Sequence, residues 1–233
     1  MTVLGIDTSS AACSAALTRD GKLLGEIIKN SGLTHSETIM PAVEALLDGE
    51  GLSPMDIDLF AAVAGPGSFT GVRIGICAVK AMAEAAGKPC ARVDALEAIA
   101  EGSAFEGLIC PILDARRQQV YTGLFKRENG ELRRVRENAA LPLEELIRSL
   151  QSETRVYFTG DGLNTYEAQL RAELGAGTLI APMHIRVLRA SAACFIAERR
   201  EELRVSARDL TPLYLRLPQV ERERNARLAR ENV

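Results

Sequence analysis

The order of predicted strands and helices is the same in both halves of this 233-residue chain, and this repeat constrains the fold most. In the first half, apolar runs bounded by turn residues predict strands at 2–7, 11–17, 22–28, 59–64 and 90–93. Helical spacing predicts helices from 35 to about 47, over 76–86 and over 95–101. From residue 108 the order restarts, with strands at 108–113, 119–126, 132–137, 156–159 and 179–181 and helices at 143–150, 161–174 and 187–200. This repeat predicts a duplicated α/β fold.

The two halves are expected to form two domains, over residues 1–103 and 104–217, followed by a tail over 218–233. The tail consists largely of Glu and Arg and has few apolar residues. Such a composition is typical of a solvated helix or a frayed end.

The composition argues against several classes of function. The net charge is −3, aromatic residues make up 4% and Trp is absent, so neither a strongly basic surface nor a base-stacking platform is expected. The five cysteines form no C-x-x-C pair, which is typical of reduced, buried thiols. No apolar run reaches membrane-spanning length, and the sequence starts directly with a strand. We therefore expect a cytoplasmic protein without membrane contact.

A glycine-rich segment, Gly65–Gly75, joins a predicted buried strand to a predicted helix. Such a turn can direct backbone N–H groups at an anion. However, the segment lacks the Lys of a Walker A loop, and its glycines do not have the G-x-G-x-x-G spacing. We favour a role in backbone geometry, in which Ser68 or Thr70 caps the helix N-terminus.

An aspartate, Asp7 or Asp114, ends the first strand of each half. A glycine-containing hairpin after such an Asp would let a phosphate approach the backbone closely. The turns that follow Asp7 and Asp114 contain no Gly. We therefore favour a structural role, in which each carboxylate accepts hydrogen bonds from nearby N–H groups.

The only histidines, His35 and His184, lie in different halves, and neither has other ligand residues at metal-binding spacing. A zinc site is therefore not expected. For His35, helix capping and solvent contacts are an adequate explanation. A Ser–His–Asp site stays open as an alternative, although the sequence has no G-x-S-x-G motif.

The repeated element order resembles the actin/Hsp70/sugar-kinase fold, which is ribonuclease H-like, and five motifs resemble the TsaB (YeaZ) family. They are Ile6-Asp7-Thr8-Ser9, His35-Ser36-Glu37 followed by Met40-Pro41, the Gly65–Gly75 segment, Asp114-Ala115-Arg116 leading to Val120-Tyr121, and Pro212-Leu213-Tyr214-Leu215-Arg216. The resemblance spans nearly the whole chain. It implies a non-catalytic subunit of the bacterial machinery that transfers threonylcarbamoyl to the adenosine beside the anticodon, in tRNAs that read codons beginning with adenine. In that family the subunit pairs with the catalytic subunit TsaD, and the ATPase TsaE joins them.

The resemblance also allows a comparison with TsaD-like proteins, which carry an H-x-x-x-H metal pair on the helix after the fifth strand. Here these two positions fall on Ala95 and Ile99, which cannot coordinate a metal. No catalytic residue is therefore carried over. The residues expected as remnants of nucleotide or anion contacts are Asp7, Ser9, Gly67, Ser68, Asp114 and Arg116.

Members of the family associate through the helix near 36–47 and the helix near 72–86. If both helices lie on one side of the sheet, their outer faces could form an apolar patch. The residues predicted for this partner interface are Ile39, Met40, Val43, Leu46, Leu47, Gly71, Gly75, Ala78 and Met82. Without the family resemblance, the same spacing would favour an ordinary helix core.

By this resemblance the isolated chain binds no cofactor, and ATP and metal belong to the partner subunits. The expected partners are a TsaD-like subunit, a TsaE-like ATPase, a second copy of the chain when alone, and tRNA only through the complex. The alternatives are an ATP-dependent kinase or ATPase of the same fold and, ranked lower, a glycoprotease-like peptidase. The sequence leaves open the oligomeric state, nucleotide binding at the subunit junction, and tRNA contact by Arg116, Arg117 or the tail.

Overall fold

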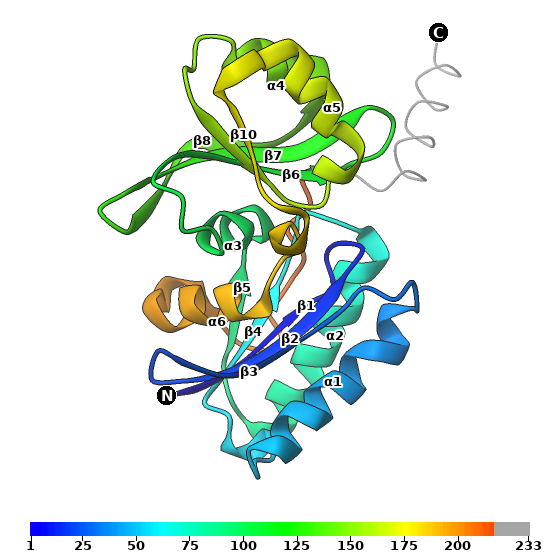
Figure 1. The fold of residues 1–233 in the computed structure, drawn as a ribbon. Helices are drawn as coiled ribbons and strands as arrows, with labels where there is room; N and C mark the ends of the chain where they lie inside the picture. The colour runs from blue at the N-terminus through cyan, green and yellow to red at the C-terminus, as the bar shows by residue number, and fades with distance from the viewer. Residues whose placement is uncertain (217–233) are drawn as a thin grey trace, which may run out of the picture.

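The computed structural model describes residues 1–216, which form two β-sheets with helices packed on their faces (Figure 1). The first sheet has six strands in the order β11-β5-β4-β1-β2-β3. Its strands are β1 (Thr2–Asp7), β2 (Cys13–Arg19), β3 (Lys22–Lys29), β4 (Leu59–Val63), β5 (Cys90–Val93) and β11 (Arg204–Val205). Strands β1, β4 and β5 run parallel, while β2 and β3 continue the sheet antiparallel.

The second sheet repeats this arrangement in the order β10-β9-β6-β7-β8. Its strands are β6 (Gly107–Asp114), β7 (Gln119–Glu128), β8 (Glu131–Pro142), β9 (Val156–Thr159) and β10 (Thr178–Ile180). Again the first strand pairs parallel on one side and antiparallel on the other. This common topology confirms the predicted duplication.

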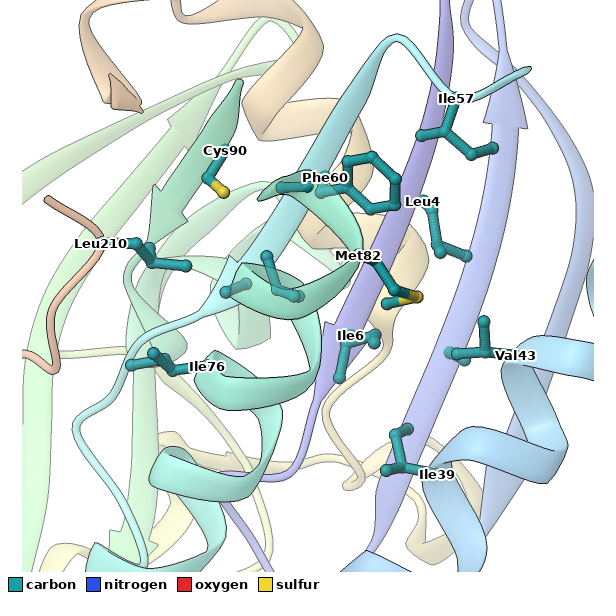
Figure 2. Close-up of a cluster of buried hydrophobic side chains, with 14 of the residues drawn as sticks. Leu4, Ile6, Ile39, Val43, Ile57, Phe60, Ile76, Met82, Cys90 and Leu210 are labelled. Atoms are coloured by element: carbon teal, nitrogen blue, oxygen red, sulfur yellow. The ribbon is translucent and has the colours of Figure 1, made fainter. Parts of the chain in front are cut away.

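Helices α1 (His35–Gly49) and α2 (Phe69–Ala86) cover one face of the first sheet (Figure 1). They bury a core against alternate side chains of β1, β2 and β4, including Leu4, Ile6 and Phe60 (Figure 2). A capping box of Thr34 and Glu37 begins α1, and Gly87, in the left-handed conformation, ends α2. Helix α2 begins seven residues before the predicted position, inside the glycine-rich segment.

The last helix of each half packs on the sheet of the other half. Helix α3 (Ala95–Glu101) follows β5 but contacts β6, β7 and β8, whereas α6 (Ala190–Arg199) follows β10 but contacts β1, β2 and β4. Helices α4 (Leu143–Leu150) and α5 (Leu163–Leu174) cover the far face of the second sheet. Four short 3₁₀ turns complete the described elements, at Pro54–Asp56, Gly175–Gly177, Met183–Ile185 and Glu201–Leu203.

The predicted extent of the second domain, 104–217, is wrong at its C-terminal end. Helix α6, strand β11 and the segment that follows them pack on the first sheet. Sequence periodicity identified α6 as a helix with a buried face, but it does not specify which sheet covers that face. The predicted tail over 218–233 lies outside the described residues.

Candidate functional site

A cleft of roughly 1240 Å³ lies between the two sheets, at the carboxyl ends of β1 and β6. Its walls come from the two turns that follow these strands, the glycine-rich segment, the start of α5 and the C-terminal segment around Tyr214. Ligands of α/β proteins bind preferentially at such strand ends. Of the residues predicted for anion contacts, Ser9, Gly67, Ser68, Asp114 and Arg116 line this cleft, whereas Asp7 is buried beneath it.

The turn after β1 is fixed against helix α2. Asp7 Oδ1 accepts the N–H of Ser9 at 2.9 Å, as predicted for a strand-ending aspartate. Thr8 Oγ1 donates to the carbonyl of Gly71 at 2.6 Å and accepts the N–H of Gly75 at 3.0 Å. Burial raises the pKa of Asp7 to about 7.

The glycines of the Gly65–Gly75 segment allow this turn to approach the helix. A Cβ atom at Gly67, Gly71 or Gly75 would collide with atoms of Thr8 or Ser9. The N–H of Ser68 donates to the carbonyl of Ser9 at 2.7 Å, and Ser68 Oγ accepts the N–H of Gly71 at 3.2 Å. These two N–H groups are therefore engaged within the chain instead of facing a phosphate. Of the two predicted helix caps, Ser68 and Thr70, the structure confirms Ser68.

The corresponding turn after β6 is open to solvent. Asp114 Oδ1 accepts the N–H of Arg116 at 2.8 Å and the hydroxyl of Tyr166 at 3.0 Å. Three successive residues, Arg116, Arg117 and Gln118, have φ angles of 63°, 55° and 58°. Each is in the left-handed region, which is unfavourable for residues other than Gly. The side chain of Arg116 is 88% exposed.

The charges that line the cleft are mixed, with more guanidinium groups than carboxylates. Five arginines line it, against the carboxylates of Asp114, Asp161 and Glu167. Glu167 pairs with Arg171 at 2.9 Å and with Arg186 at 2.6 Å. Burial raises the pKa of Asp161, whose Oδ2 accepts the N–H of Ala11 at 3.3 Å and so links the two units. The arrangement is suited to holding an anion.

Sequence reasoning missed several residues at this cleft. Asp161 follows β9 after Gly160, so its position at the carboxyl end of a parallel strand was the available signal. Phe69 and Tyr214 stack with their ring centroids 5.1 Å apart. The Arg73 guanidinium lies 3.7 Å from the Phe69 ring centre, and its Nε donates to the Tyr214 hydroxyl at 2.8 Å. No local motif joins residues so far apart in the chain.

The histidines do not form a metal site. Nε2 of His35 lies 2.8 Å from the carbonyl oxygen of Ser10, so this residue contacts the first turn while Thr34 caps the helix. His184 lies apart, exposed in a 3₁₀ turn. Residues 1–216 contain no group of three or more His, Cys, Asp or Glu side chains that could hold a metal ion. Ala95 and Ile99 are buried in the core around α3.

The predicted apolar partner patch is largely wrong as an exposed surface. Ile39, Val43 and Met82 point into the core, as Figure 2 shows. Leu46, Leu47, Gly71 and Gly75 are buried as well. The stripe at helical spacing is the face that α1 uses against the sheet, which is the ordinary result for such a pattern.

The small or apolar residues of α1 and α2 that are not buried form a smaller set. Met40 is 43% exposed, and Ala78 is half-buried. Further exposed small or apolar positions on the two helices are Pro41, Ala45, Cys77, Ala81 and Ala85. The two helices lie side by side on the outer face of the first sheet (Figure 1). We call these seven residues the outer α1/α2 face.

None of the helices within residues 1–216 is both long and apolar enough to cross a membrane.

Comparisons with known proteins find similarity to proteins of tRNA threonylcarbamoyladenosine biosynthesis. The family model described as "TsaD: tRNA N6-adenosine threonylcarbamoyltransferase" matches residues 23–221. The chain is 36% identical to the tRNA threonylcarbamoyladenosine biosynthesis protein TsaB of Bacillus subtilis, over 95% of this chain and 96% of that protein. The solved structure of YeaZ from Pseudomonas aeruginosa is 29% identical, with a TM-score of 0.78 over 92% of this chain and 99% of that one.

A more distant structure has the fold alone. The (R)-2-hydroxyglutaryl-CoA dehydratase component A of Acidaminococcus fermentans is 12% identical, with a TM-score of 0.50 over 85% of this chain and 98% of that one. The fold is the predicted one, a duplicated α/β architecture.

Proposed function

Because this chain belongs to the TsaB (YeaZ) family, we propose that it serves tRNA threonylcarbamoyladenosine biosynthesis as a non-catalytic partner subunit. Its contribution is to pair with a TsaD-like catalytic subunit and to support binding of a TsaE-like ATPase. The observation that carries this proposal is the engaged glycine-rich segment. The N–H of Ser68 is held by the Ser9 carbonyl, and the Thr8 side chain fills the space beside Gly75.

The residues of the chain support assigning the chemistry to partner subunits. The positions that match the metal pair of TsaD-like proteins are the buried Ala95 and Ile99. In this proposal ATP and metal belong to the partners, tRNA is engaged within the complex, and the chain forms a homodimer when alone.

The outer α1/α2 face is the proposed contact with the TsaD-like subunit. Small side chains at Ala81 and Ala85 let a partner helix approach closely, and Met40 offers an adaptable apolar side chain. Of the residues predicted for this interface, only Met40 and Ala78 belong to the outer α1/α2 face.

The test is reconstitution with the cognate TsaD-like and TsaE-like proteins. We expect threonylcarbamoyl transfer to tRNA to require this chain, and full activity without it would overturn the proposal. A Met40→Asp substitution should weaken the association with TsaD by about 2–5 kcal/mol, because it buries an unpaired carboxylate. Val135→Asp is the matched control, since Val135 is 44% exposed on β8 of the second sheet and should leave the association unchanged.

The alternative of an ATP-dependent enzyme is favoured by one observation, the cleft of roughly 1240 Å³ at the strand ends above Asp7. Isothermal titration of the isolated chain with ATP and magnesium distinguishes the two. Clear binding that Asp7→Ala abolishes would favour the enzyme, and no binding at millimolar ATP would exclude it.

A further inference from the structure

We propose that the mouth of the cleft binds a single-stranded segment of the tRNA substrate, with Arg116 and Arg117 contacting its phosphates. This inference rests on the proposed function, because it assumes that tRNA is the substrate of the complex. It adds a direct contact between this chain and RNA, made while the chain is part of the complex.

Charge is the first argument. The chain as a whole has a net charge of −3, yet its cleft is lined by five arginines and three carboxylates. Burial raises the pKa of one of these carboxylates, Asp161, which reduces its tendency to carry negative charge. Three of the arginines pair with Asp114 or Glu167, yet the five guanidinium groups outnumber the carboxylates, and this excess of positive charge in an acidic protein favours an anionic partner.

Presentation of the arginines is the second argument. The turn over Arg116, Arg117 and Gln118 holds all three residues in the left-handed region. Strain of this kind persists only where the surroundings impose it, and it clusters at functional sites. Here Asp114 accepts the N–H of Arg116, and the N–H of Leu143 donates to the carbonyl of Gln118 at 3.0 Å. The strained turn presents two guanidinium groups at the rim without a flexible loop.

The floor and the size of the cleft are the third argument. The N–H of Ser68 is already engaged by the Ser9 carbonyl at 2.7 Å, so this part of the glycine segment is not available to a phosphate. Arg116 and Arg117 line the cleft at its mouth, where their guanidinium groups can contact an anion. The cleft of roughly 1240 Å³ is also larger than the ~300–1,000 Å³ typical of small-molecule pockets, which fits an extended polymer better.

Aromatic residues at the cleft are the fourth argument. Phe69 and Tyr214 line the cleft and stack on each other, and Tyr214 is 42% exposed. Arg73 braces this pair through the Phe69 ring and the Tyr214 hydroxyl. An exposed tyrosine beside guanidinium groups is the usual combination for single-stranded nucleic acid, where a base stacks and its phosphate pairs with Arg. An acidic peptide carries no bases to stack on this pair, so the combination favours RNA.

The test measures tRNA binding by the reconstituted complex of this chain with its TsaD-like and TsaE-like partners. The double variant Arg116→Ala/Arg117→Ala should raise the dissociation constant about tenfold at 0.1 M salt. The slope of log K against log salt should fall by about 1.4, which is two contacts at about 0.7 each for single strands. The matched control is Arg133→Ala/Arg148→Ala, which removes two exposed arginines outside the cleft and should change neither value.

A charge-retaining variant, Arg116→Lys/Arg117→Lys, separates loss of charge from damage to the turn, and it should keep most of the affinity for tRNA.

Unchanged tRNA binding by the Ala double variant would overturn the inference. The inference would also be overturned if polyglutamate displaced tRNA from the complex as well as single-stranded RNA of matched charge does. ATP–magnesium binding that depends on the same two arginines would overturn it too. If the complex assembles and needs this chain for activity while tRNA binding is unchanged, only this inference fails. Activity without the chain would instead remove the proposed function.

Discussion

The two strand-ending aspartates close the same kind of turn in two different environments. After β1, the turn over Thr8 and Ser9 is buried against the glycines of α2. After β6, the turn over Arg116 and Arg117 is exposed and strained. The duplicated topology supplies the same local hydrogen bond in each half. The element that packs on the turn decides whether it becomes part of the core or part of a surface.

The largest expected effect concerns the buried aspartate. Burial raises the pKa of Asp7 from 3.8 to about 7, so the folded state keeps a proton that the unfolded chain has lost. The folded state then binds more protons, and stability falls as the pH rises from about 4 to about 7. Asp7→Asn keeps an acceptor for the N–H of Ser9 but cannot ionise. Its stability relative to the unsubstituted chain should increase by about 4 kcal/mol across this range.

Urea unfolding at several pH values between 4 and 8 measures this effect. Asp161→Asn, at the neighbouring link to Ala11, should show the same sign, because burial raises that pKa as well. If the free energies of unfolding of Asp7→Asn and of the unsubstituted chain changed with pH in the same way, the turn after β1 would not be a dry environment.

The second prediction concerns the close packing of the turn after β1 against α2. Gly71→Ala places a Cβ against the carbonyl oxygen of Thr8 and strains the hydrogen bond from Thr8 Oγ1. We expect a loss of about 3 kcal/mol or more, measured by thermal and urea unfolding. Gly49→Ala is the matched control, since nothing lies within 4 Å of its added Cβ at the end of α1, and it should be neutral or stabilise by up to about 1 kcal/mol. Similar losses in both variants would mean that the close approach contributes little.

The sequence predicted the elements of both halves because apolar runs and turn residues are local signals. It also predicted the hydrogen bonds of Asp7 and Asp114 and the cap at Ser68, which depend on residues only a few positions apart. Prediction from the sequence failed where the structure depends on contacts between residues far apart in the chain. The spacing of Ile39 and Val43 identifies a buried stripe, but it does not tell whether a sheet or a partner covers the stripe.

The same reason explains the exchange of α3 and α6 between the sheets, since each helix has an apolar face that either sheet could bury. The stacked pair of Phe69 and Tyr214 could not be predicted from the sequence either, because the C-terminal segment reaches α2 only in the folded chain. Low aromatic content argued against a stacking platform, yet two aromatics brought together by the fold are enough to form a stacked pair at the cleft.

The smallest expected effect tests the strain of the second turn. Gln118 has a φ of 58°, a conformation that costs roughly 1–2 kcal/mol for a residue with a side chain. Gln118→Gly removes this cost, and the greater freedom of glycine in the unfolded chain offsets part of the gain. A net stabilisation of about 0.5 kcal/mol is expected from urea unfolding.

Gln151→Gly is the matched control, because the exposed Gln151 has a right-handed φ of −61° at the end of α4. There the substitution should destabilise by about 0.5–1 kcal/mol, so opposite signs are expected at the two glutamines. Equal destabilisation would mean that the turn which presents Arg116 and Arg117 is not strained, and presentation could then no longer support the proposed RNA contact.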